Sequence, residues 1–258
     1  MHFTPSHHWG VRNSILVGLP APELDALRPL INAVRVGARV VLQEAKRRIE
    51  YVNFVESGIV SSRVRVAGST LETALLGSKN AVGLSIALGN DRSCSQSVTI
   101  SQSTMLRVGA VDLLQLMSDR PVLREHLLKH LHARMMHSSQ IALCSARHEI
   151  EPRLASWLCL AHKASAGQSI AMTHSELSVI LGLRRPSVTE ALARFQSRGL
   201  IRKTRGLIEI DSYEPLRSAA CACVAAIEDA YLTAKLLCKK SELHAPLELR
   251  SAMVAAQS

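Results

Sequence analysis

The stretch THSELSVILGLRRPSVTEALARF, residues 173–195, predicts two short helices joined by a tight turn. Thr173 and Glu176 have the T-x-x-E spacing of a capping box, in which each side chain bonds the backbone N–H of the other residue. Gly182 suits the left-handed position that ends a helix, and Pro186 suits a first helical turn. Two helices joined by a short turn that contains glycine form a helix-turn-helix.

The second of these helices separates a buried face from an exposed one. Its apolar side chains recur at helical spacing and are expected to pack inward: Val188, Ala191, Leu192 and Phe195. In a helix-turn-helix, the N-terminal end of the second helix enters the major groove of DNA. We therefore expect Arg185 to read guanine, while Ser187, Thr189 and Glu190 add base or backbone contacts.

A basic hairpin follows the second helix. In GLIRKTRGLIEI, residues 199–210, two β-like runs flank Arg205–Gly206 and predict a wing. Between residues 184 and 205 the only acid is Glu190, and the bases are Arg184, Arg185, Arg194, Arg198, Arg202, Lys203 and Arg205. The whole chain has 31 Lys and Arg against 21 Asp and Glu, a net charge of +10 that favours a polyanionic partner. We expect phosphate contacts from Thr173, Arg194, Lys203 and Arg205, with Arg184 also in the DNA-binding set.

The segments before this motif predict two further units. Residues 34–108 alternate short apolar runs with Gly, Ser and Asn, which indicates an antiparallel β roll or barrel. Residues 111–148 are helical in pattern, and the part from Pro121 to His148 would be about 42 Å long. We interpret this helix as a spacer and dimer seam, the alternative being a plain core helix. The apolar stripe assigned to that seam is Leu123, Leu127, Leu131, Met135, Ile141 and Cys144.

The quoted motif resembles the winged helix-turn-helix of the Crp/Fnr family of bacterial transcription regulators. YVNFVESGIVSS, residues 51–62, resembles a β-roll segment of that family, and ACACV, residues 220–224, resembles a Cys-rich run in some members. The resemblance implies an α+β fold with two domains. It divides the chain into a jelly-roll-like sensor domain (1–110), a dimerisation helix (111–148), a DNA-binding domain (149–215) and a helical tail without an assigned role (216–258).

The family's cyclic-nucleotide cassette is incomplete in VGLSIALGNDRS, residues 82–93. The effector-binding residues that the resemblance implies are Gly83, Arg92 and Ser93. Leu84 stands where the family has the Glu that holds the ribose, which speaks against a cyclic nucleotide. In the recognition helix, Arg185 matches a family base contact. Pro186 and Glu190 replace a base-reading Glu and an Arg of many members, so the preferred DNA site is expected to differ.

The other chemistry-bearing residues follow no motif that we recognise. The six cysteines have no C-x-x-C spacing and are expected to be free thiols, and Cys221-x-Cys223 is too tight for a zinc knuckle. His126 and His130 have an i, i+4 ligand spacing, but we expect them, with His132 and His137, to be solvated or interfacial. We therefore expect no metal, iron–sulfur cluster, haem or cyclic nucleotide. No catalytic motif is present, so we expect no enzyme.

The sequence favours a homodimeric, sequence-specific DNA-binding transcription regulator. The alternative is a sensor of cyclic nucleotides or other small molecules whose helix-turn-helix serves protein contacts. The expected partners are double-stranded DNA, a second copy of the chain and RNA polymerase. No membrane span is predicted. MHFTPSHHWG at the start lacks a signal-peptide pattern, so we expect the cytoplasm.

Overall fold

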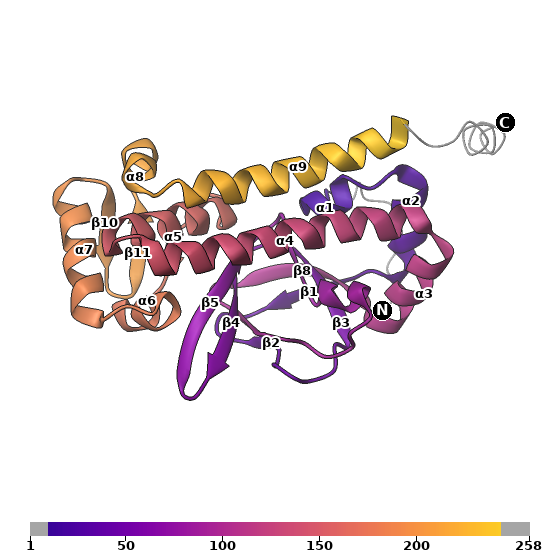
Figure 1. The fold of residues 1–258 in the computed structure, drawn as a ribbon, viewed down its shortest axis with the longest axis horizontal. Helices are drawn as coiled ribbons and strands as arrows, with labels where there is room; N and C mark the ends of the chain where they lie inside the picture. Colours follow the sequence, from indigo (N-terminus) through magenta and orange to yellow (C-terminus); the bar gives the residue numbers. More distant parts are fainter. Residues whose placement is uncertain (1–9, 244–258) are drawn as a thin grey trace.

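The computed structural model describes residues 10–243, with side chains up to Leu237. The start of the N-terminal decapeptide, the end of the predicted tail and the side chain of Cys238 therefore lie outside the described residues. The chain forms a β roll, a long helix, and a C-terminal helical domain with a small sheet (Figure 1). This arrangement confirms the predicted α+β fold with its antiparallel roll, long helix and winged helix-turn-helix.

Two antiparallel four-stranded sheets form the roll, in the orders β1-β8-β3-β6 and β2-β7-β4-β5. Their strands are β1 (Asn32–Val36), β2 (Val41–Gln43), β3 (Tyr51–Ser57), β4 (Val60–Val66), β5 (Ser69–Leu76), β6 (Ala81–Val82), β7 (Gln96–Thr99) and β8 (Ser103–Gly109). Between β3 and β4 lies Gly58 with φ +89°, where a Cβ would clash with the Ser103 hydroxyl. Only glycine fits this turn, because it lacks the Cβ that would clash.

Helices precede, follow and interrupt the strands. The helical segments outside the C-terminal domain are α1 (Ser14–Val17), α2 (Ala21–Leu27), the 3₁₀ turns η1 (Arg28–Leu30) and η2 (Leu84–Leu88), α3 (Ala110–Asp119) and α4 (Pro121–Arg147). Leu123, Leu127 and Leu131 of α4 are buried in one apolar cluster with Phe54 and Val108 of the roll. The first half of α4 is therefore part of the core of the β roll.

The C-terminal domain follows α4, and its last helix runs back alongside α4. Its elements are α5 (Ile150–Ala164), β9 (Ile170–Ala171), α6 (His174–Leu181), α7 (Arg185–Ser197), β10 (Ile201–Thr204), β11 (Leu207–Ile210), α8 (Tyr213–Ala219) and α9 (Cys223–Leu243). Helix α9 lies alongside α4 (Figure 1), where Ala133 packs with Ile227 and Tyr231. The hydroxyl of Tyr231 and Nδ1 of His137 are 3.0 Å apart.

This packing corrects the predicted dimer seam. Leu123, Leu127 and Leu131 are covered by the chain's own roll, and Cys144 is buried beside the start of α9. Of the predicted stripe, Met135 is exposed and lines a pocket between α4 and the roll. Met136 and Leu143, which the stripe omitted, are seven residues apart on one side of α4 and are also exposed. The predicted stripe therefore combined residues from two faces of α4. Periodicity could not separate these faces, because apolar residues occur on both.

Candidate DNA-binding interface

The first helix of the motif begins and ends as its sequence predicts. The Thr173 hydroxyl accepts from the Glu176 backbone N–H at 3.1 Å, and Glu176 Oε2 accepts from the Thr173 N–H at 2.8 Å. These reciprocal bonds satisfy donors that a helix N-terminus leaves free. Gly182 follows α6 with φ +61°, and a Cβ there would meet Leu71 Cδ1 of β5 at 3.3 Å.

The recognition helix α7 is fixed from its inner face. All four side chains expected to be buried are fully buried, namely Val188, Ala191, Leu192 and Phe195. The turn before α7 is held from α5, since Arg153 Nη2 donates to the Leu181 carbonyl oxygen at 2.5 Å. The outer face of α7 is thereby presented on a rigid support, as a base-reading element requires.

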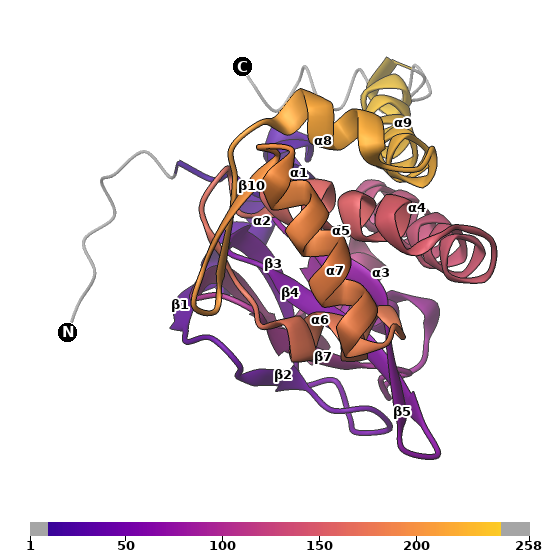
Figure 2. The same ribbon diagram turned by 90° about the vertical axis from the view of Figure 1, so that its left-hand side faces the viewer.

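Two exposed arginines lie at the start of α7. Arg184 is the N-cap and Arg185 the first helical residue; both are exposed, and neither forms an ion pair with any residue in 10–243. Figure 2 shows α7 facing the viewer, with α6 below it and the strand β10 beside it. Unpaired cations at a helix N-terminus add to the positive end of the helix dipole, so this corner attracts anions.

The other predicted base contacts differ in exposure. Glu190 is exposed and Ser187 is half-buried. The Thr189 hydroxyl donates to the Arg185 carbonyl oxygen at 3.0 Å and lies 3.0 Å from Nδ1 of His174. Thr189 therefore links the two helices of the motif.

The wing is a three-stranded antiparallel sheet rather than a simple hairpin. Gly206, with φ +76°, turns β10 into β11, and β11 also pairs with β9. The two-residue strand β9 was not predicted, because so short a run has no detectable period. Arg205 is exposed at the turn and Lys203 is half-buried. Arg202 instead contacts Asp211 at 3.1 Å and Glu209 at 3.7 Å.

Two of the predicted phosphate contacts already have protein partners. Thr173 uses its N–H in the capping box, and its hydroxyl lies 2.8 Å from Glu176 Oε2. Arg194 Nε pairs with Glu151 at the start of α5. Their roles on DNA stay predictions, and both would have to exchange a protein partner for phosphate.

His174 belongs to this surface although no motif indicated it. Burial lowers its pKa, and the nearby charges of Lys203 and Arg185 lower it further. The side chain is therefore neutral near pH 7. The only feature of the sequence that could have indicated His174 as part of this surface is its position directly after the predicted N-cap, Thr173.

The motif also touches the chain's own β roll. Arg39 Nε, from the loop before β2, donates to Glu176 Oε1 at 2.9 Å. Burial tends to raise the pKa of Glu176, but the bonds from Arg39 and Thr173 outweigh this and hold it below its ordinary value. Trp157 Nε1 of α5 donates to the buried Glu72 Oε1 of β5 at 2.7 Å. The β roll and the helices of the C-terminal domain thus share polar contacts.

Known proteins share both the motif and the architecture. Residues 152–219 match the family model of the Crp-like helix-turn-helix domain. FixK2 from Bradyrhizobium japonicum is 18% identical, with 74% of this chain and 98% of that chain covered at a TM-score of 0.64. A putative Crp/Fnr regulator from Eubacterium rectale is 16% identical, covering 80% and 96% at a TM-score of 0.63. No curated protein matches the chain.

Residues 152–219 form a Crp-like helix-turn-helix domain, and the chain shares the fold of these solved structures. The family model covers the domain that carries α6 and α7, and the solved structures share the fold over 74% to 80% of this chain. Another of them is CLP from Xanthomonas campestris, described as a c-di-GMP responsive global regulator, at 18% identity and a TM-score of 0.60. It covers 74% of this chain and 99% of its own.

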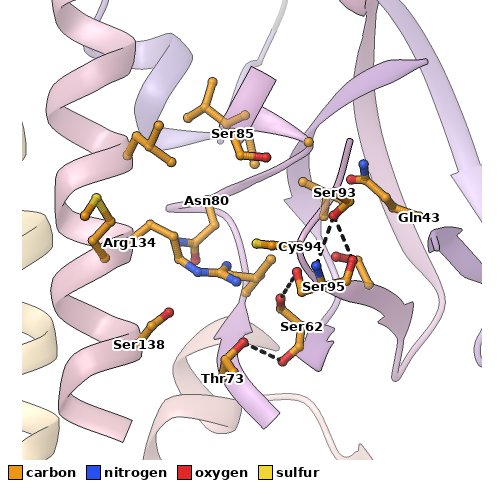
Figure 3. Close-up of a pocket in the computed structure, with 18 of the residues that line it drawn as sticks. Gln43, Ser62, Thr73, Asn80, Ser85, Ser93, Cys94, Ser95, Arg134 and Ser138 are labelled. Atoms are coloured by element: carbon orange, nitrogen blue, oxygen red, sulfur yellow. Dashed lines mark hydrogen bonds between the residues drawn. The ribbon is translucent and has the colours of Figure 1, made fainter. Parts of the chain in front are cut away.

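The strands of the β roll and helix α4 line a cavity of about 440 Å³. Of the three predicted effector residues, Gly83 and Ser93 line this cavity and Arg92 does not. Arg92 is exposed and donates to the Lys46 carbonyl oxygen at 3.1 Å, so it lies outside this cavity. Figure 3 shows that Arg134 of α4 points into the cavity instead, toward Cys94.

The histidines of α4 were expected to be solvated or interfacial, and the structure corrects this for three of the four. His126, His130 and His137 are buried, while only His132 is exposed as predicted. His126 Nε2 lies 2.7 Å from the Ile15 carbonyl oxygen. Burial lowers the pKa of both His130 and His137 to about 3. These imidazoles are therefore neutral components of the core.

Four other potential ligands meet where the sequence predicted no metal site. Cys144 and His148 at the end of α4 lie beside Cys221 and Cys223 at the start of α9. No motif joins the two pairs, because the whole DNA-binding domain lies between them in the sequence. As for membranes, no helix within residues 10–243 is both long and apolar enough to span one.

Proposed function

We propose that this Crp/Fnr-type regulator binds an inverted-repeat DNA site as a homodimer in the cytoplasm and acts on transcription through RNA polymerase. The observation that carries the proposal is a pair of exposed arginines at the start of α7, Arg184 and Arg185, which have no ion-pair partner among the described residues. Arg185 reads guanine there, and Arg184 binds the adjacent backbone. Ser187, Thr189 and Glu190 contribute the remaining contacts of the helix.

Phosphate contacts complete the interface. Lys203 and Arg205 approach the backbone from the wing, whereas Thr173 and Arg194 do so after releasing their present partners. This assignment gives the protein a binding function rather than an enzymatic one. The proposed division of labour is a sensor in residues 1–110, a connecting helix in 111–148, DNA binding in 149–215 and a tail in 216–258.

Homodimerisation is supported by the outer side of α4. Met136 and Leu143, seven residues apart on one side of α4, are exposed by 48% and 49% although they are large and apolar. Burying such a stripe against a second copy, related by a two-fold axis, removes apolar surface from water. Each protomer then offers one recognition helix, with half-sites about one helical turn apart.

The deciding experiment is selection of tight binders from random DNA duplexes with purified full-length protein. An enriched inverted repeat supports the proposed dimeric sequence reader. Enrichment of a single half-site contradicts the dimer, and retention of all sequences alike contradicts base reading. A parallel selection in cell extract supplies any effector that orders the dimer, so that absence of enrichment in both samples overturns the proposal.

A second candidate function, favoured by the cavity, is sensing of a small anionic effector. Arg134 points into it and forms no ion pair with a described residue, and burial lowers its pKa. An anion would restore the lost solvation of this guanidinium. Calorimetry with cyclic AMP, cyclic GMP and cyclic di-GMP tests this second function. Binding that is lost in Arg134→Ala and kept in Arg92→Ala supports the site. If none of the three nucleotides gives a heat of binding, they are excluded as effectors.

A further inference from the structure

Four thiol and imidazole side chains converge at the base of the DNA-binding domain. Cys144 and His148 are four residues apart, on the last turn of α4 and just after it, so they face the same way. Cys221 lies in the link after α8, and Cys223 begins α9. All three cysteines are buried, and His148 is half-buried.

The spacing of the four ligand atoms fits one small tetrahedral ion. All four atoms lie within 4.8 Å of one another. The Sγ atoms of Cys144 and Cys221 are 3.5 Å apart, and Cys223 Sγ is 3.4 Å from His148 Nδ1. Around a tetrahedral zinc ion, with its usual bond lengths, sulfurs stand about 3.7 Å apart and a sulfur and nitrogen about 3.5 Å. Only small side-chain shifts are needed to close such a site.

A neighbouring amide directs a donor at one of the sulfurs. Gln140 Nε2 donates to Cys223 Sγ at 3.1 Å. The Ser156 hydroxyl lies 3.0 Å from Cys221 Sγ and donates its hydrogen to the Pro152 carbonyl oxygen at 2.7 Å. A donor at a sulfur suits a thiolate, which only accepts hydrogen bonds, better than a thiol. Such outer contacts orient and tune the ligands in metal sites.

We propose that Cys144, His148, Cys221 and Cys223 bind one structural Zn²⁺ ion. Three sulfurs and one imidazole nitrogen form a soft donor set that selects zinc over Ca²⁺ or Mg²⁺, which require oxygen ligands. Four protein ligands leave no open position for water or substrate, so the site is structural rather than catalytic. Binding releases the thiol protons to solvent and involves no electron transfer.

The position of the ion gives it a mechanical role. Cys144 and Cys221 are 77 residues apart, and the complete winged helix-turn-helix lies between them. A metal that joins them closes this segment as a loop and fastens it to the end of α4. Because α4 also packs into the sensor core, the ion fixes the DNA-binding domain relative to the sensor.

The test uses full-length protein prepared in reductant without chelator. We expect about one zinc per chain by elemental mass spectrometry. Replacement of the zinc by Co²⁺ should give the intense visible bands and thiolate charge-transfer absorption of a tetrahedral S₃N site. Neither readout depends on DNA binding, so the result is independent of the proposed function.

Matched variants assign the ligands. Cys144→Ser should lose the metal and the cobalt spectrum, while Cys159→Ser, which alters a buried cysteine of the same domain outside the group, should retain both. His148→Cys supplies a fourth thiolate and should keep the metal with an altered spectrum, even if Cys144→Ser folds poorly. The proposal is overturned by wild-type protein with less than about a tenth of an equivalent of zinc and no cobalt spectrum. Metal retained by Cys144→Ser, or a Cys144–Cys221 disulfide in place of metal, also overturns it.

Discussion

Arg185 carries the sharpest prediction at the scale of a single residue. Its side chain is exposed at the first position of α7 and has no acidic partner among the described residues. We expect Arg185→Ala to cost about 1–3 kcal/mol at one base pair and to relax the preference there, because a bidentate contact to guanine is lost. Binding assays on duplexes that vary at each position measure this.

Lys203→Ala is the matched comparison on the wing. A phosphate contact carries no sequence information, so this variant should weaken all duplexes alike and flatten the slope of log K against log salt by about one. Equal losses on every sequence for Arg185→Ala would place that residue on the backbone and remove it from base reading.

Glu72 predicts a pH effect of unusual sign. Burial raises the pKa of this carboxyl, although its bonds with Ser61 and Trp157 oppose the shift. The folded protein therefore holds the proton more tightly than the unfolded chain, and stability falls as the pH rises from about 4.3 toward the folded pKa. Glu72→Gln, which can keep both hydrogen bonds, should remove this slope in urea unfolding. An unchanged slope would mean that Glu72 ionises freely in the folded state.

At the scale of elements, α4 combines an inner face in the core with an outer apolar face. We expect Met136→Glu to weaken dimerisation about a hundredfold, because two copies would bring like charges together near the axis. Analytical ultracentrifugation measures this, with Val66→Glu as the control, since Val66 is 74% exposed on the β4–β5 hairpin. Equal effects of the two variants would exclude this face as the seam.

The buried histidines predict that α4 loses its packing in acid. The pKa of His130 is lowered to about 3, so the unfolded chain takes up a proton first as the pH falls below about 6.5. Stability that is complete above this pH is then lost by about 1.4 kcal/mol per pH unit for each such histidine. In urea unfolding, His130→Leu should reduce this acid dependence, whereas His132→Leu, at an exposed position, should leave it unchanged. The reverse result would show that His130 titrates normally.

The whole molecule sets the geometry of its DNA site. A two-fold dimer places its recognition helices about 34 Å apart, so the half-sites face the same side of the duplex. Inserting about five base pairs between them rotates one half-site by half a turn and should reduce affinity to that of a single half-site. Band-shift titrations measure the loss of affinity. An insertion of about ten base pairs is the control, because it lengthens the spacing by one full turn and leaves both half-sites on the same side of the duplex. Unchanged affinity after the shorter insertion would contradict a rigid dimer.

The sequence by itself determined the elements whose signals are local. The capping box at Thr173 and Glu176, the left-handed Gly182 and the buried side of α7 all lie within 23 consecutive residues. Helix ends and helical periodicity are set by neighbours in the chain, so they can be read without a fold. The alternating runs of the roll were recognised for the same reason.

Only the tertiary structure decided which distant residues meet. It buried three histidines of α4, directed Arg134 rather than Arg92 into the cavity, and brought Cys144 and His148 to Cys221 and Cys223. It also gave Glu176, a capping residue, a second partner in Arg39 of the roll. These contacts depend on how α4, α9 and the two sheets pack. Packing joins residues far apart in the chain, and no local pattern records which of several apolar or polar faces will be covered.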